Sequence, residues 1–220
     1  MLVICSTVKG GSGTSVVAAS LAIAALRVHP ESTSLVVDLA GDQPAVLGLP
    51  EPAFGLTDWM AQRNDLRFED AMGVHERLHL VGRGRGLLPS SHHESWNDLR
   101  DELLERSRRG DTVVVDVGRG VLPCDFDDHA LRLLVVQPCY MALRRFVENR
   151  PDVDGTVVVC PPDRVLTVSD VATVTELPVL AQIPMHPDVA RRVDAGLLRS
   201  RLPRIIHVPL AALLSKTTHS

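Results

Sequence analysis

The chain has 220 residues, and its 45% content of hydrophobic residues is enough for one domain with a full core. A net charge of −4 argues against a polyelectrolyte, and an aromatic content of 3% argues against nucleic-acid binding that stacks bases on aromatic side chains. The sequence shows neither a signal peptide nor an apolar run of about 20 residues, the length that spans a bilayer. We therefore expect a single domain over residues 1–220, located in the cytoplasm.

Short β-branched runs alternate with helical patterns along the chain. The core strands are apolar on both faces, as in a parallel sheet that is covered on both sides. This alternation predicts βαβ units in a doubly wound α/β domain, a three-layer sandwich whose mostly parallel sheet is flanked by helices. The predicted strands are 2–8, 34–39, 78–82, 112–118, 131–137, 155–160 and 178–184. The predicted helices are 15–28, 94–109, 139–149, 168–176, 187–195 and 205–215.

Two regions of the chain are less regular than the rest. The segment 40–94 is rich in Gly, Pro and His, and it is predicted to carry mobile loops. The last helix is entered through Pro203, and we expect it to be interrupted near Pro209 because proline has no N–H to donate inside a helix.

The stretch KGGSGTS, residues 9–15 and called the glycine loop below, follows the first predicted strand and opens the first predicted helix. Glycines let backbone N–H groups approach phosphate oxygens, and the helix N-terminus adds a favourable dipole. In a P-loop, G-x-x-x-x-G-K-[ST], the final hydroxyl binds Mg²⁺, and Ser15 has this place. Thr14 stands where the lysine is expected. The alternative is a tight turn that needs glycines for geometry alone, and the loop by itself leaves both readings open.

The spacing of the glycine loop resembles the deviant Walker A motif, K-G-G-x-G-[K]-[ST], of the ParA/MinD family of ATPases. The segment 36–50 resembles the second strand and switch I of that family, and 112–120 resembles Walker B and switch II. The segment 133–144 is similar to the following strand and helix, and 179–196 is similar to the segment near the adenine. The resemblance therefore covers essentially the whole chain. The segment 51–60, EPAFGLTDWM, is similar to a subgroup of pilus-assembly localisers of the CpaE/TadZ type.

The resemblance implies a P-loop fold that binds ATP or ADP with Mg²⁺ and forms a homodimer. In the family, the lysine at the position of Lys9 reaches across a nucleotide-sandwich dimer to the phosphates of the partner. Asp38 matches the first aspartate of switch I, so Lys9 and Asp38 are catalytic candidates. Ser15 and Asp116 are the candidates for holding Mg²⁺. The residues that the resemblance assigns to the nucleotide are Gly10, Gly11, Ser12, Gly13, Thr14, Ser15 and Pro184.

The chain departs from the family pattern at three functional positions. Thr14 replaces the P-loop lysine, Ala40 replaces the aspartate that orients water, and Cys160 replaces the asparagine that commonly reads adenine. Asp42 is a further catalytic candidate, although two residues of extended chain move a carboxylate by several ångströms, at roughly 3.3 Å per residue. Each lost electrostatic group typically costs about 10²–10³-fold in rate. We therefore expect hydrolysis to be slow or absent.

The C-terminal region is basic, with a net charge of +5 from residue 191 onward. Such a region is a candidate for nonspecific DNA binding, because clustered arginines attract phosphates. The alternative is a solvated helix face beside an apolar core helix. Membrane binding is not expected, because IIHVPLAALL has no clear basic face and contains Pro209. The arginines in question are Arg191, Arg192, Arg199, Arg201 and Arg204.

Three functional hypotheses follow from these features. The first is a degenerate ParA/MinD-like protein that dimerises, binds a protein partner and acts in positioning or assembly, such as partition, division-site or pilus localisation. Its ATP hydrolysis would be weak or absent. The second is an active ATP-dependent dimerisation switch that uses Lys9 in trans. The third is a DNA-binding module that works through the basic C-terminal region without nucleotide. Nucleotide-dependent dimerisation separates the first two from the third, and turnover separates the first from the second.

Overall fold

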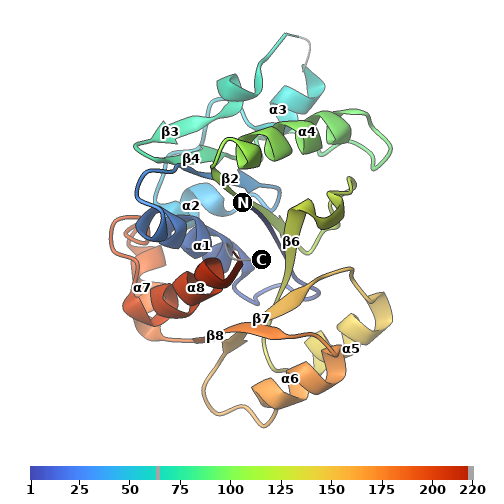
Figure 1. Cartoon of the computed structure of the whole chain (residues 1–220), viewed down its shortest axis with the longest axis vertical. Coiled ribbons are helices and arrows are strands. Elements are labelled where there is room, and N and C mark those ends of the chain that lie inside the picture. The colour runs from blue at the N-terminus through green and yellow to red at the C-terminus, as the bar shows by residue number, and fades with distance from the viewer. Residues whose placement is uncertain (63–64, 218–220) are drawn as a thin grey trace.

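The computed structural model describes residues 1–62 and 65–217, and its centre is an eight-stranded sheet (Figure 1). The strand order is β3-β4-β2-β5-β1-β6-β7-β8; β3 pairs antiparallel with β4, and all the other neighbours pair in parallel. The strands are β1 (Leu2–Ser6), β2 (Ser34–Asp38), β3 (Gly73–His75), β4 (Leu78–Val81), β5 (Thr112–Gly118), β6 (Ala130–Val136), β7 (Gly155–Cys160) and β8 (Val179–Pro184).

Helices cover both faces of the sheet, so the fold has three layers. The helices are α1 (Thr14–Val28), α2 (Gln43–Leu47), α3 (Leu56–Ala61), α4 (Ser95–Arg108), α5 (Tyr140–Asn149), α6 (Val168–Thr175), α7 (Pro187–Asp194) and α8 (Arg204–Thr217). Helices α1, α2, α7 and α8 lie on one face, whereas α3 to α6 lie on the other (Figure 1). The strands are buried on both sides, as their apolar runs predict. The three-layer α/β prediction is confirmed.

Helix α1 is the central helix of its layer. It packs between the sheet and α8, and ten of its fifteen residues are buried. Its sequence is apolar nearly all round, which is the composition of a helix enclosed by other elements. Burial on every side fixes the direction of α1, and its N-terminus therefore holds the glycine loop at the carboxyl end of β1.

The segment 40–94 contains more regular structure than predicted. It forms the short helices α2 and α3 and the antiparallel edge strand β3, in addition to the predicted β4. Trp59 and Met60 of α3 are buried against the sheet, and the ring of Trp59 meets Phe68 edge to face at 5.3 Å between centroids. Helices of five or six residues show less than two turns of apolar periodicity, so the sequence pattern could not reveal them.

The expected interruption of the last helix is wrong. Helix α8 runs from Arg204 to Thr217 with Pro209 inside it. Proline removes one backbone hydrogen bond, but Ile206, Leu210 and Leu213 are buried in the core on this face of the sheet. This burial keeps the segment helical. In the described part of the chain, no helix is both long enough and apolar enough to cross a membrane.

Candidate functional site

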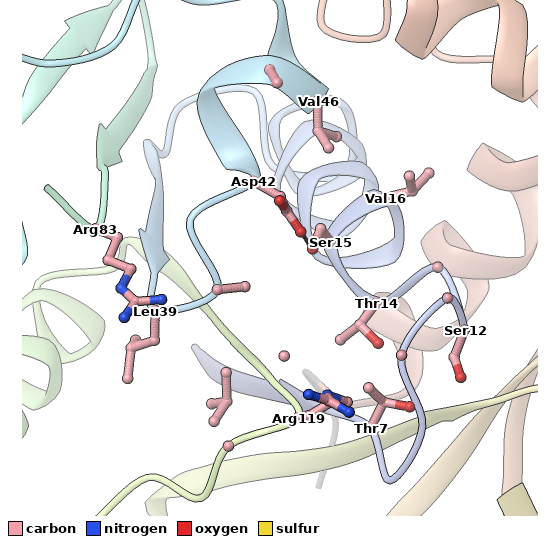
Figure 2. Close-up of a pocket in the computed structure, with 18 of the residues that line it drawn as sticks. Thr7, Ser12, Thr14, Ser15, Val16, Leu39, Asp42, Val46, Arg83 and Arg119 are labelled. Atoms are coloured by element: carbon pink, nitrogen blue, oxygen red, sulfur yellow. Dashed lines mark hydrogen bonds between the residues drawn. The ribbon is translucent and has the colours of Figure 1, made fainter. Parts of the chain in front are cut away.

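A cleft with a volume of about 1010 Å³ lies at the carboxyl ends of the central strands (Figure 2). Its walls come from the loops that follow β1, β2, β4 and β5, together with the end of α7. Because these four strands run in parallel, the loops after them meet at one edge of the sheet, where open α/β sheets bind ligands. The sequence-predicted loop 10–15 lies in full along this cleft.

The glycine loop has the geometry of an anion-binding turn. Gly13 precedes α1 with φ of 85°, a left-handed conformation that favours glycine. The loop is held by internal bonds: the Ser12 hydroxyl donates to Lys9 O at 2.7 Å, and the Gln137 amide donates to Gly11 O at 2.9 Å. The backbone N–H groups at the start of α1 therefore face the cleft in a fixed arrangement, and they and the helix dipole favour a bound anion.

The Thr14 side chain is the most informative group in the loop. Its hydroxyl oxygen is buried and has no hydrogen-bond partner. The residue is only 5% exposed, and the surface that it does expose lines the cleft. Burial of an unpaired hydroxyl is unfavourable. A ligand oxygen in the cleft would give this hydroxyl the partner that it lacks, so the orphaned group fits a bound phosphate.

Ser15 and Asp42 form a pair on the same side of the cleft. The Ser15 hydroxyl donates to Asp42 Oδ2 at 3.5 Å, and both side chains line the cleft (Figure 2). A hydroxyl and a carboxylate are ligands that Mg²⁺ accepts. The sequence assigned Asp42 to catalysis because it lies two residues beyond Ala40. In the structure, Asp42 is instead next to the hydroxyl that the P-loop pattern assigns to the metal.

Asp116 lies behind the cleft rather than on its surface. It is fully buried, and its carboxylate accepts hydrogen bonds from the Gln43 amide at 2.8 Å and from Gly118 N at 3.2 Å. Burial raises its pKa, and the hydrogen bonds from Gln43 and Ser15 oppose that shift. Both carboxylate oxygens thus have protein donors. Of the two predicted metal candidates, Ser15 faces the cleft and Asp116 does not.

Gln43 is a residue that the sequence pattern did not identify. Its amide nitrogen donates to both Asp116 Oδ2 and Ser15 O, and the side chain is fully buried. Gln43 therefore connects the segment after β2 to β5 and to α1. Gln43 directly follows Asp42 in the sequence, but no local sequence pattern distinguishes a buried glutamine that bridges two segments from an exposed one.

Asp38 holds the turn after β2. Its two carboxylate oxygens accept hydrogen bonds from Gly41 N at 2.7 Å and from Gln43 N at 2.9 Å, and the residue is fully buried. Burial raises the pKa of Asp38 to about 6, although the two backbone hydrogen bonds oppose the shift. Asp38 does not line the cleft. Its contacts are those of a residue that shapes the turn carrying Ala40 and Asp42.

Lys9 and Pro184 also lie outside the cleft lining. The Lys9 ammonium donates to Gly10 O at 3.3 Å at the exposed tip of the loop. Pro184 ends β8 and pairs in register with Cys160 of β7. Neither residue touches the space that Thr14 and Ser15 face, so any contact of these two residues with a ligand stays a prediction.

Ala40 lines the cleft and presents a methyl group where the resemblance expects a carboxylate. Its Cβ lies 3.1 Å from the place that a Cβ on Gly118 would occupy, so the segments after β2 and β5 are in close contact. Among the described residues, no group of three or more His, Cys, Asp and Glu side chains is placed to hold a metal ion. A metal at this site would therefore depend on Ser15, on Asp42 and on the oxygens of its ligand.

The sequence and the fold were compared with those of known proteins. No protein-family model matches the sequence. The chloroplastic/mitochondrial cysteine–tRNA ligase CPS1 of Zea mays is 29% identical over 93 residues, which are 40% of this chain and 16% of the ligase. The chain thus matches a small part of the length of that enzyme.

Solved structures match nearly the whole chain. A chain of the MinC:MinD cell division protein complex of Aquifex aeolicus has a TM-score of 0.72 at 16% identity, covering 100% of this chain and 97% of that one. The septum site-determining protein MinD of Pyrococcus horikoshii, complexed with Mg-ADP, has a TM-score of 0.71 at 21% identity and covers 99% and 96%. The chain has the fold of MinD.

A ParA-family ATPase of Chlorobium tepidum shares this fold, with a TM-score of 0.68 at 19% identity and coverage of 96% and 98%. The MinD/ParA fold accounts for the position of the cleft, because it places the glycine loop, the segment after β2 and the segment after β5 at one edge of the sheet. The fold predicted from the resemblance is confirmed.

The Gln43 bridge provides a first prediction. We expect Gln43→Leu to lower the free energy of unfolding by about 2–3 kcal/mol, because it removes two buried hydrogen bonds, one of them to a carboxylate. Leucine has nearly the same volume, so the loss reports on the polar contacts. Denaturant unfolding measures it. The control Gln182→Leu changes an exposed residue and should stay within about 0.5 kcal/mol. Equal effects at both positions would contradict the bridge.

A second prediction concerns pH. Because the pKa of Asp38 is about 6 in the folded chain and about 3.9 in an unfolded one, the folded chain binds the proton of the Asp38 carboxyl group more tightly than the unfolded chain does. The stabilisation from protonation is complete below about pH 4 and is lost as the pH rises through about 6. Between pH 7 and pH 5 the wild-type chain should gain about 1 kcal/mol relative to Asp38→Asn, measured by urea unfolding without nucleotide or metal. Parallel pH profiles for the two chains would contradict the raised pKa.

The basic residues of the C-terminal region lie around the end of α7 and the start of α8. Arg191, Arg201 and Arg204 are exposed. Arg192 pairs with Asp188 at 3.5 Å and donates to Arg201 O at 3.3 Å. Three of these arginines are thus exposed to solvent, whereas Arg192 forms an ion pair within the chain. DNA binding through them stays a prediction.

Proposed function

We propose that this chain is a nucleotide-binding positioning or assembly protein of the MinD/ParA type that hydrolyses ATP slowly or not at all. The observation that supports it most directly is the Thr14 hydroxyl, buried without a partner at the N-terminus of α1 and lining the cleft. It stands where an active P-loop has its lysine. The site thus keeps the geometry for binding phosphate and lacks a principal group for transferring it.

Binding is supported by the parts of the cleft that do not depend on the lysine. The glycine loop presents backbone N–H groups, the dipole of α1 favours negative charge, and the cleft is large enough for a nucleotide. Ser15 and Asp42 would hold Mg²⁺. When bound there, Mg²⁺ neutralises charge on the phosphate oxygens. The structure of Pyrococcus horikoshii MinD contains Mg-ADP, which agrees with this assignment.

Slow hydrolysis is supported by what the cleft lacks. Phosphoryl transfer needs cationic charge at the transferring phosphate and an oriented water. Ala40 offers no carboxylate to orient water, and both oxygens of Asp38 are occupied by backbone N–H groups. Each lost group costs about 10²–10³-fold in rate. In this proposal, nucleotide acts mainly as a ligand that changes the state of the protein.

The experiment that tests binding is titration calorimetry with MgATP and MgADP. We expect dissociation constants in the micromolar range, and Ser15→Ala should weaken MgADP about 10-fold while changing metal-free ADP little, because the serine acts through the metal. Ser200→Ala, an exposed serine outside the cleft, is the control and should change neither constant. No heat at millimolar nucleotide would overturn the proposal. Robust hydrolysis that Asp116→Ala abolishes would overturn the proposal that hydrolysis is slow or absent, and it would favour an active ATP-dependent switch.

The positioning role predicts a nucleotide-dependent change of oligomeric state. The MinC:MinD complex of Aquifex aeolicus shows that a protein of this fold assembles with a protein partner. We propose that this chain forms a homodimer with MgATP and that Lys9, at the exposed tip of the loop, contacts the partner's nucleotide. Sedimentation velocity with and without MgATP tests this. Wild type should dimerise with MgATP, and Lys9→Ala should remain monomeric.

A further inference from the structure

Arg119 lies against the glycine loop. It follows Gly118 at the end of β5, and Thr7 N donates to Gly118 O at 2.8 Å, which fixes this segment beside the loop after β1. Its Cδ and Nε atoms lie 3.5 Å and 3.9 Å from the place that a Cβ on Gly10 would occupy. Arg119 is exposed and lines the cleft. Its guanidinium therefore stands at the wall where the glycine loop presents its N–H groups.

Arg83 reaches the same cleft from the loop after β4. Its Cδ lies 3.5 Å from the place that a Cβ on Gly41 would occupy, and the side chain is half-buried. Figure 2 shows the side chains of Arg83 and Arg119 directed into the open space that Thr14 and Ser15 face. The two arginines come from different loops, so their meeting at one cleft is a result of the strand order.

Neither guanidinium is neutralised by the protein. Within residues 1–62 and 65–217, Arg83 and Arg119 form no ion pair and no side-chain hydrogen bond. The other charged residues on the cleft wall are Asp42, which is next to Ser15, and Asp194 of α7. Two guanidinium groups that form no ion pair therefore line the same cleft as the N–H donors of the helix start and the buried Thr14 hydroxyl.

We propose that Arg119, assisted by Arg83, replaces the missing P-loop lysine and binds the phosphate chain of the nucleotide. The inference rests on the proposed function for the identity of the ligand. A guanidinium donates two parallel hydrogen bonds to phosphate oxygens, and it carries its charge at every physiological pH. A lysine at position 14 would bring its charge from inside the loop. Arg119 brings the same charge from the segment after β5.

Arg119 and a P-loop lysine would contact the phosphates from different segments of the chain. The lysine of a P-loop is part of the loop itself, whereas Arg119 belongs to the segment that follows the buried Asp116. Nucleotide bound by Arg119 would therefore contact the segment that follows β5 as well as the glycine loop.

The test compares the binding of MgADP and of inorganic pyrophosphate to full-length variants by calorimetry. Arg119→Gln should weaken both ligands about 10- to 100-fold, because it removes charge-assisted hydrogen bonds. Arg83→Gln should weaken them about 3- to 10-fold. Arg119→Lys keeps the charge and should lose less affinity than Arg119→Gln. Arg85→Gln is the matched control, since Arg85 is exposed two residues beyond Arg83 and lies outside the cleft lining, and it should stay within about 2-fold.

The outcomes separate this inference from the proposed function. If wild type and Arg119→Gln bind MgADP equally, the inference is overturned and the nucleotide-binding function stands. If pyrophosphate binds with the predicted dependence on Arg119 but no nucleotide binds, the arginine site stands and the proposed function fails. If wild type binds neither ligand, both are overturned. Because Arg119 is exposed and unpaired, its variants should melt at the wild-type temperature, so a binding loss will report on the contact.

Discussion

The double variant Thr14→Lys, Ala40→Asp is expected to hydrolyse MgATP at least about 100-fold faster than the wild-type chain. Phosphoryl transfer requires a cation at the transferring phosphate and a positioned water, and the group that positions the water, which Ala40 cannot supply, contributes about 10²–10³-fold. Both positions line the cleft. The Thr14 hydroxyl has no partner, so replacing it breaks no hydrogen bond. Steady-state release of phosphate measures the gain.

The single variants decide which group limits the rate. Thr14→Lys alone should tighten nucleotide binding more than it raises turnover, because the charge acts on the bound phosphates before reaction. Ala40→Asp alone should raise turnover without a large change in affinity. Adding Ser15→Ala to the double variant should remove the gain, which excludes a contaminating ATPase. A double variant that binds MgATP and turns over at the wild-type rate would contradict the assignment of slow hydrolysis to these two positions.

Gly48→Ala is expected to lower the free energy of unfolding by about 3 kcal/mol or more. Gly48 ends α2 with φ of 66°, and a Cβ there would lie 2.2 Å from Gly196 O. Such a contact forces the backbone of one segment to move, because the atom in the way is not the end of a flexible side chain. Gly196 follows α7, so this close approach joins the end of α2 to the end of α7.

A matched glycine separates the steric clash from the cost of the backbone conformation. Gly110 also has a positive φ, of 100°, but nothing lies within 4 Å of the place its Cβ would take. Gly110→Ala should cost about 1–2 kcal/mol from the left-handed conformation alone. Urea unfolding of both variants measures the difference. If the two variants lose equal stability, the contact between Gly48 and Gly196 contributes nothing of its own.

The same contact affects the cleft. Val46 of α2 and Val193 and Asp194 of α7 lie on its wall. Moving α2 away from α7 would widen this side of the cleft, so Gly48→Ala should also weaken MgADP binding. The affinity of Gly110→Ala should equal that of wild type, because Gly110 lies between α4 and β5, outside the cleft lining.

The sequence by itself determined the fold and the place of the candidate site. Apolar runs of strand length alternate with helical patterns, and a strand buried on both faces requires helices on both sides. The glycine loop after the first strand located the site, because a strand, a glycine turn and a helix N-terminus place backbone N–H groups at one point regardless of the rest of the chain. The departures at Thr14 and Ala40 were likewise readable from the sequence.

The tertiary structure decided which side chains reach the cleft. Asp38 and Asp116 are tied to protein donors, whereas Asp42 lies next to Ser15. Gln43 and Arg119 had no sequence signal of their own, whereas Arg83 belongs to the segment RGRG, 83–86, which the sequence alone allows either to contact phosphates or to form a flexible turn. Arg83 and Arg119 are 36 residues apart along the chain, and the order β4-β2-β5-β1 brings their loops to one edge of the sheet. The local sequence pattern predicts where a strand begins and ends. Only the pairing of strands that are distant in the sequence determines which loops meet at one site.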